Sequence, residues 1–108
     1  MIHTALWQPE LEQLNSSQMA LFIMQVNKKY NLALKDYASL HQWSIDYSAD
    51  FWSELWSFAN VVGDAGSIVI KHPNKMPGAE FFPEAQLNFA ENLLALSERH
   101  PNGDALVF

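Results

Sequence analysis

The chain has 108 residues, a net charge of −6 and an apolar fraction of 49%. A chain of this length forms one domain at most and buries only roughly 60 to 65% of the surface that it exposes when unfolded, and its apolar content excludes disorder. Its basic residues never form a run longer than Lys28-Lys29, so we expect neither nucleic acid nor an anionic membrane as a partner, because both require clustered cations.

The chain contains no cysteine, which excludes disulfides and thiolate metal sites. The opening residues MIHTALWQPE hold no basic region followed by an apolar core, so we expect no signal peptide. The longest apolar run is too short to span a bilayer. These features predict a cytoplasmic location.

Residues 1–15 form a predicted lead-in, in which Pro9 interrupts any early helix. A first helix is predicted in QMALFIMQVNKKY, ending near Asn31, with an N-cap among residues 15–17. Its apolar residues recur with the period of a helix, at Met19, Phe22, Ile23, Val26 and Tyr30.

Two further helices are predicted in the aromatic middle of the chain. The first lies in KDYASLHQWSID, with Asp36 as N-cap and an apolar side made of Tyr37, Leu40, Trp43 and Ile45. The second lies in ADFWSELWSFANVV, capped by Ser48 and ended by Gly63 in a left-handed conformation. Its two apolar stripes are so wide that we expect burial between two surfaces; they comprise Phe51, Leu55, Phe58 and Val62, and Trp52, Trp56 and Ala59.

The last third of the chain mixes an extended segment, a loop and a helix. The β-branched residues 68–70 predict a short strand that needs a partner, and the prolines and glycine of residues 72–84 predict irregular loop. Asn88 and Glu91 have the spacing of a capping box before a helix. That helix carries Phe89, Leu93 and Leu96 on one face and ends at Pro101, and the final ALVF resembles a strand cut short.

No arrangement of residues in the sequence predicts catalysis or metal binding. The four histidines stand far apart, without a His or carboxylate three or four positions away on a clear helical face. Asp50 and Glu54 are helical neighbours, and a solvated helix face explains them better than a cation site or an acid/base pair. Nucleophile elbows, phosphate loops and dinucleotide fingerprints do not occur. We therefore expect no catalytic, cofactor-binding or metal-binding residue in this chain.

Aromatic residues are numerous, with four Trp, seven Phe and three Tyr. These rings could compensate for the small size of the domain, or some of them could face a partner; the sequence leaves both interpretations open. Base stacking is disfavoured, because no basic groove accompanies the rings.

Two stretches resemble the N-terminal region of acetyl-CoA synthetase-like adenylate-forming enzymes, and in particular the branch specific for acetoacetate. The first, residues 30–58, contains a Y-x-x-L-x-x-W-S segment followed by an F-W motif, matched by Tyr37, Leu40, Trp43, Ser44, Phe51 and Trp52. The second, residues 77–94, resembles W-F-P-G-x-x-L-N-x-A-E-N-L, matched by Phe82, Pro83, Leu87, Asn88, Ala90, Glu91, Asn92 and Leu93. Phe81 replaces the family's Trp and Glu84 its Gly, so the turn after Pro83 is expected to differ.

The resemblance implies a mainly α cap of about four helices with one short extended segment, over residues 16–104, followed by the truncated first strand of a catalytic domain at 105–108. Such enzymes join a carboxylic acid to CoA through an acyl-adenylate, using ATP and Mg²⁺. Their catalytic motifs lie in later domains, so this chain would be structural, with the missing catalytic domain of the same polypeptide as partner. The residues expected to serve structure or that interface are Trp43, Trp52, Trp56, Phe82, Asn88, Phe89 and Glu91.

Two alternatives remain open at the level of sequence. The same cap could come from an acetyl- or propionyl-CoA synthetase, or the chain could be a free-standing helical module whose aromatic face binds another protein. A cap separated from its catalytic domain would expose apolar surface, so self-association of the isolated chain is a further expectation.

Overall fold

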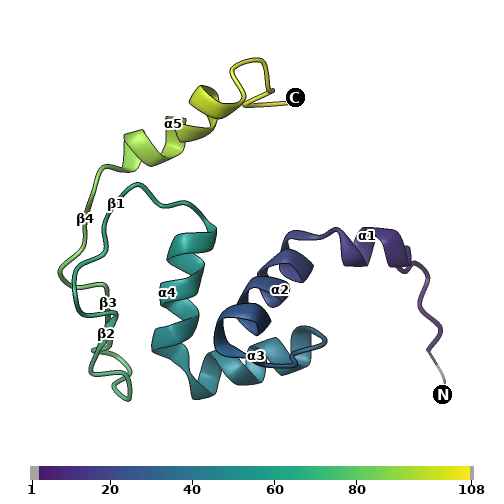
Figure 1. The fold of residues 1–108 in the computed structure, drawn as a ribbon, viewed down its shortest axis with the longest axis horizontal. Helices are drawn as coiled ribbons and strands as arrows, with labels where there is room; N and C mark the ends of the chain where they lie inside the picture. Colours follow the sequence, from purple (N-terminus) through teal and green to yellow (C-terminus); the bar gives the residue numbers. More distant parts are fainter. Residues whose placement is uncertain (1–2, 108) are drawn as a thin grey trace. The chain divides into compact units, whose positions relative to one another are not determined.

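The computed structural model describes residues 3–107. These residues form two compact units, with the boundary between Phe51 and Trp52. We call them the N-terminal unit (3–51) and the C-terminal unit (52–107). The helices are α1 Leu11–Asn15, α2 Gln18–Tyr30, α3 Tyr37–Asp46, α4 Ser48–Phe58 and α5 Phe89–Arg99 (Figure 1). The strands are β1 Gly63–Asp64, β2 Ile70–Lys71, β3 Glu80–Phe81 and β4 Gln86–Leu87. The prediction of a small, mainly α chain is confirmed.

The caps of α2 and α3 are those that the sequence predicts. The Ser17 hydroxyl accepts the N–H of Ala20 at the start of α2. At the start of α3, the Asp36 carboxylate accepts the N–H of Ser39 while the Ser39 hydroxyl accepts the N–H of Asp36, a reciprocal pair that satisfies two free amides. Asn31 ends α2 in a left-handed conformation.

The core of the N-terminal unit is apolar and aromatic. Its buried side chains come from α2 and α3: Phe22, Val26, Leu40 and Trp43. The Trp43 ring contacts Tyr30 at 5.4 Å between centroids and Phe51 at 6.4 Å, and Phe51 meets Phe22 edge to face at 5.8 Å. Tyr37 and Ile45, which the helical period also places on α3's apolar side, remain exposed.

Two features of the N-terminal unit differ from the predicted elements. Residues 11–15 of the lead-in form α1, because Pro9 precedes the first turn, where a missing N–H breaks no intrahelical hydrogen bond. Ser48 is the first residue of α4 rather than its cap, since α4 follows directly on Tyr47, the residue that ends α3.

The C-terminal unit begins within α4, and the sequence prediction misplaced the end of that helix. Asn60 takes the left-handed conformation after the helix (φ 54°), and the N–H of Val61 bonds to the carbonyl of Trp56. Gly63 lies instead in β1 with φ 153°, where a Cβ would stand 2.7 Å from the carbonyl oxygen of Gln86. Gly63 is therefore required for close strand approach and not for the helix end.

Residues 63–87 fold back on themselves as a hairpin with two short antiparallel ladders. β1 pairs with β4, Gly63 facing Leu87, and β2 pairs with β3, Ile70 facing Phe81 (Figure 1). The predicted strand at residues 68–70 thus finds its partner inside the stretch predicted to be irregular loop. The described residues contain four short strands, whereas one short extended segment was predicted. The difference arises because two-residue strands leave no periodic signal in sequence.

Helix α5 follows the hairpin directly, and none of its residues is buried. The Asn88 side chain accepts the N–H of Glu91 at 3.0 Å, so the predicted cap is present in its Asn88 half. Residues 105–107 form no strand, and Phe108 lies outside the described residues. The division into lead-in, cap and truncated strand stays a prediction.

Candidate functional site: an aromatic pocket on α4 and the junction of α5

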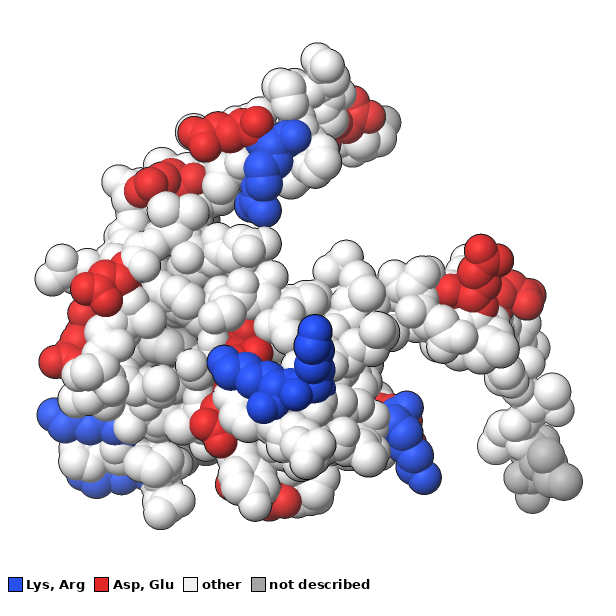
Figure 2. Space-filling model, viewed as in Figure 1, with Lys and Arg blue, Asp and Glu red and all other residues white. Residues whose placement is uncertain are grey.

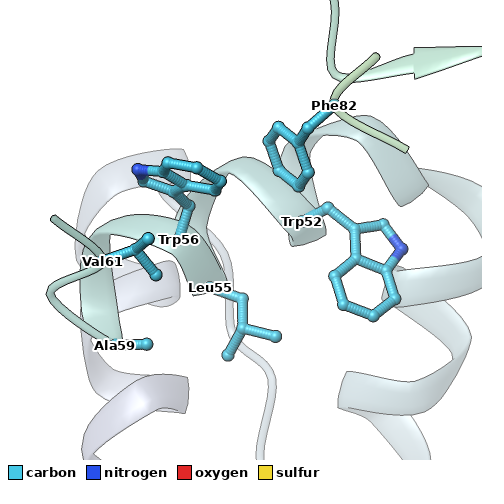
Figure 3. Close-up of a pocket in the computed structure, with 6 residues that line it drawn as sticks. All are labelled: Trp52, Leu55, Trp56, Ala59, Val61 and Phe82. Atoms are coloured by element: carbon cyan, nitrogen blue, oxygen red, sulfur yellow. The ribbon is translucent and has the colours of Figure 1, made fainter. Parts of the chain in front are cut away.

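An apolar pocket of about 240 Å³ lies in the C-terminal unit, against α4. All of its lining residues are apolar or aromatic: Trp52, Leu55, Trp56, Ala59, Val61 and Phe82. Figure 3 shows the Phe82 ring projecting from the loop after β3 toward the part of α4 that carries Trp52 and Trp56. A pocket of this composition suits an apolar side chain and offers no polar group to orient a small polar ligand.

Two adjacent phenylalanines meet two tryptophans one helical turn apart on α4. Phe81 contacts Trp52 at 5.6 Å, edge to face, and Phe82 contacts Trp56 at 4.8 Å. In a regular strand successive side chains point to opposite faces. Phe82 has a φ of 48°, which is uncommon for a residue with a bulky side chain, and this local turn lets both rings face the same helix.

The loop before β2 and the turn after Pro83 are joined by Glu84. Its carboxylate accepts the Ser67 hydroxyl at 2.8 Å and the Ser67 N–H at 3.2 Å. These bonds, the hydroxyl first, lower the pKa of Glu84 below its ordinary value of 4.5, and the negative charge of Asp64 opposes them. Glu84 therefore links the two ladders of the hairpin, which a glycine at this position could not do.

The junction between the hairpin and α5 depends on Asn92. Its side-chain oxygen accepts the N–H of Val62 at 2.7 Å, and its amide donates to the carbonyls of Val62 and Asn88, both at 2.9 Å. One residue further along, Gly63 pairs with Leu87. The segment LNFAEN thus supplies a strand residue, a helix cap and a clamp within six positions.

The apolar face of α5 is uncovered. Phe89 is 76% exposed and Leu93 67%, and Leu94 and Leu96 are exposed as well. The last residues of the unit fold back to leave a hollow of about 540 Å³ beside Leu93, Leu96 and Leu106. An amphipathic helix whose apolar side contacts so little has the character of a docking element.

The predicted structural residues divide between the two units. Trp43 lies in the core of the N-terminal unit, whereas Trp52, Trp56 and Phe82 form the pocket of the C-terminal unit. Asn88 and Glu91 meet at the start of α5, next to exposed Phe89. Their roles at an interface stay a prediction.

One interpretation of the carboxylates is wrong. Asp50 is exposed as expected, but Glu54 is only 1% exposed, so the two do not share a solvated helix face. Glu54 is not without a partner, since no buried side-chain polar atom among the described residues lacks a hydrogen bond. The helical period alone places Glu54 beside an apolar stripe, and tertiary packing then buries it.

The described residues do not fit ATP, Mg²⁺ or CoA. Residues 3–107 bring together no group of three His, Asp or Glu side chains, and the pocket lining carries no cation for a phosphate. Lys and Arg are scattered among acidic residues on the face drawn in Figure 2, with no continuous basic area. We therefore derive no catalytic step from this chain.

Within the described range, none of the helices has both the length and the apolar character needed to cross a membrane.

Sequence reasoning missed the polar residues that hold loops in place. Asn27 binds the N–H and the carbonyl of Leu34 and closes the α2–α3 loop, as Asn92 does for Val62. Ser67 and Glu84 join positions 17 residues apart. The clue for Asn92 was its place in the motif that ends the second matched stretch; Asn27 had no comparable signal.

Comparisons with known proteins agree on one family. The family model described as the N-terminus of acetyl-coenzyme A synthetase matches residues 37–93. The acetoacetyl-coenzyme A synthetase of Rhizobium meliloti is 39% identical over 103 residues, which cover 95% of this chain and 15% of that protein. The acetoacetyl-CoA synthetase of Macaca fascicularis is 33% identical over 101 residues, covering 92% of this chain and 14% of the relative.

A relative with a different acyl group in its name has a comparable percentage identity over a shorter stretch. The malonamoyl-CoA synthetase of Penicillium aethiopicum is 40% identical over 81 residues, covering 73% of this chain and 11% of that protein. The chain therefore spans only 11 to 15% of the length of these curated relatives. No solved structure matches the chain significantly.

Proposed function

This chain belongs to the acetyl-coenzyme A synthetase N-terminus family, and from that premise we propose that it is the non-catalytic N-terminal domain of an acetoacetyl-CoA synthetase. The parent enzyme would join acetoacetate to CoA through an acyl-adenylate, with ATP and Mg²⁺ bound by residues outside this chain. The cap would comprise residues 16–104, with 105–108 leading into the catalytic part, and the enzyme would work in the cytoplasm.

The observation that carries the proposal is the extent of the similarity. The acetoacetyl-CoA synthetases of Rhizobium meliloti and Macaca fascicularis match 95% and 92% of this chain, yet the match covers only 15% and 14% of their own length. The remainder of such an enzyme is large enough to hold the chemistry that the described residues do not support. The partner of this chain would accordingly be the catalytic part of the same polypeptide.

Two uncovered apolar surfaces support a docking role. The first is the pocket on α4, where Trp52 is 37% exposed beside Phe81 at 52%. The second is the face of α5, where Phe89 and Leu93 are each more than two-thirds exposed. Burial of one such side chain contributes roughly 1.5 to 3 kcal/mol. In the absence of the catalytic part these surfaces would favour self-association of the isolated chain.

Malonamoyl-CoA formation is the second candidate activity, because the relative named for it is 40% identical to this chain. Nothing in the described residues selects one acyl group over the other. The acid would be chosen in the catalytic part, so the two candidates share the same role for this chain.

The test begins with the polypeptide in the source cell that carries this chain, purified with an antibody against residues 1–108. We expect a polypeptide several times longer than 108 residues that forms AMP when given ATP, Mg²⁺, CoA and acetoacetate, and less with malonamate, acetate or propionate. A 108-residue polypeptide without synthetase activity would overturn the proposal and favour a free-standing interaction module.

The isolated chain provides the complementary measurement. Titration calorimetry with Mg-ATP and with CoA should give no binding heat. Tight binding of either compound would contradict a purely structural role.

A further inference from the structure

Helix α5 is attached to the rest of the C-terminal unit by polar contacts rather than by apolar packing. None of its residues is buried, and its large side chains Phe89, Leu93 and Leu96 are all more than half exposed. Most helices in proteins are held by the packing of an apolar face. A helix without such packing can change its direction relative to the hairpin unless hydrogen bonds fix it.

Asn92 supplies the hydrogen bonds that fix this direction. Its carboxamide pairs with both the N–H and the carbonyl of Val62, at 2.7 and 2.9 Å, in the way that a second peptide group would. The same NH₂ group also donates to the carbonyl of Asn88 at 2.9 Å, which lies one turn earlier in the chain. A single side chain therefore ties residue 62, 30 positions away, to the first turn of α5.

The backbone around this contact permits little adjustment. Gly63 follows Val62 and pairs with Leu87, and any side chain at position 63 would stand 2.7 Å from Gln86 O and from Leu87 Cβ. The β1–β4 ladder thus ends at the point where the Asn92 clamp begins. Together they hold the two chain segments on either side of the hairpin close to each other.

We propose that Asn92 is the positioning residue that holds α5 in one direction on the hairpin of residues 62–87, and that it thereby presents the apolar face of α5 to the catalytic part of the enzyme. The second half rests on the proposed function; the first half does not. The clamp needs an amide, because an ionised carboxylate at position 92 accepts the N–H of Val62 but repels its carbonyl.

The direction of α5 is measured by electron paramagnetic resonance between two spin labels. The chain has no native cysteine, so Lys71→Cys on β2 and Glu98→Cys on α5, both exposed, would be labelled uniquely. With Asn92 intact we expect one narrow distance distribution. Asn92→Ala should broaden it at least about two-fold while the far-ultraviolet circular dichroism is retained, since the substitution removes side-chain bonds and leaves the backbone bonds within α5 in place.

The matched control is Asn88→Ala, which removes a side-chain bond from the same helix but leaves the Val62 contacts in place. It should leave the distribution narrow. A distribution in Asn92→Ala as narrow as that of the parent, at the same distance, would overturn the proposal.

Asn92→Asp keeps the proposal testable if the alanine variant does not fold. At pH 7 its distribution should be broad, and near pH 3 it should narrow to the width that the parent shows at the same pH, because a protonated Asp, with an ordinary pKa of about 3.9, regains a donor for the Val62 carbonyl. A merely structural residue gives no such recovery. If Asn92→Asp stays as narrow as the parent at pH 7, the amide is not the clamp.

The presenting role is tested separately in the longer polypeptide. There Asn92→Ala should speed proteolytic cleavage between residues 62 and 92 and lower the melting temperature, whereas Asn88→Ala should change cleavage less. Unchanged cleavage alongside broadened label distances would refute the presenting role and retain the clamp. Absence of synthetase activity in the unsubstituted polypeptide would instead refute the proposed function.

Discussion

The two units of the chain use similar helices in opposite ways. Every buried apolar residue within the described range, namely Phe22, Val26, Leu40 and Trp43, lies in the N-terminal unit. The C-terminal unit has α5, with an equally regular apolar stripe, and yet buries none of it. A stripe therefore identifies the face that needs a cover but does not say whether the cover belongs to the same unit.

The source of stability differs accordingly. The N-terminal unit depends on rings packed around Trp43, an effect that grows with the apolar area removed from water. In the C-terminal unit, Phe81 and Phe82 pack on α4, but the closure of the hairpin and the attachment of α5 depend on side chains that bond backbone groups, notably Glu84 and Asn92. Hydrogen bonds of this kind contribute about 1 kcal/mol each, so we expect the C-terminal unit to open first when the isolated chain is destabilised.

The largest effect expected from this comparison comes from Trp43→Ala. Loss of a buried indole that contacts Tyr30 and Phe51 should lower the free energy of unfolding by about 3 to 5 kcal/mol. Chemical denaturation followed by circular dichroism measures it. The control is Trp7→Ala, whose side chain is 74% exposed and whose loss should cost less than about 0.5 kcal/mol. Equal effects of the two substitutions would show that the N-terminal unit does not depend on the packing of Trp43.

Phe89→Ala tests whether the apolar face of α5 is covered in the longer polypeptide but not in the isolated chain. In the isolated chain the substitution should change the unfolding free energy by less than about 0.5 kcal/mol, because Phe89 is 76% exposed. In the longer polypeptide it should cost about 1.5 to 3 kcal/mol if the catalytic part covers α5. Thermal denaturation of both forms measures the two costs, with exposed Leu6→Ala as the control. If Phe89→Ala changed the stability of neither form, the catalytic part would not cover α5.

The helix caps allow the two units to be compared through the same kind of substitution, at the start of α2 and at the start of α5. Ser17→Ala and Asn88→Ala each remove the side chain that accepts an N–H at a helix start. We expect Ser17→Ala to lower the global unfolding free energy by about 1 kcal/mol, since α2 is part of the core. Asn88→Ala should cost less than half of that globally and appear instead as faster amide exchange in the first turn of α5. Equal global losses would show that α5 unfolds together with the core.

The smallest expected effect is the pH response of the Glu84 contact. Because hydrogen bonds from Ser67 lower the pKa of Glu84 in the folded chain, the contact stabilises the hairpin above the unfolded value of 4.5 and is lost as the pH falls through the lowered folded value. The chemical shift of the Ser67 amide should therefore titrate with a midpoint below pH 4.5. In Glu84→Gln, which still accepts these bonds but does not ionise, that titration should vanish; a titration that persists would assign it to Asp64.

Sequence patterns predicted much of the N-terminal unit and less of the C-terminal one. The bounds of α2 and the caps at Ser17 and Asp36 follow from a helical period and from polar side chains that satisfy nearby amides. The end of α4 was wrong, because Asn60 and Gly63 both tolerate a positive φ and only the pairing of Gly63 with Leu87 separates their roles.

The candidate site was predicted in part. Trp52, Trp56 and Phe82 were named from their ring chemistry and do line one pocket, but the contact of both Phe81 and Phe82 with α4 depends on the backbone turn at Phe82. Asn92 was noticed only as a motif residue, since no local rule links it to a backbone 30 positions away.

The helical character of the chain, the caps at Ser17, Asp36 and Asn88, the lack of a recognisable catalytic motif and the family all follow from local spacing and residue types. Tertiary structure decided which apolar faces are covered, where Glu54 is buried and how the hairpin closes through Ser67, Glu84 and Asn92. The physical reason is range: helix periods and caps act over three or four residues, whereas burial and clamps join positions that only the folded chain brings together.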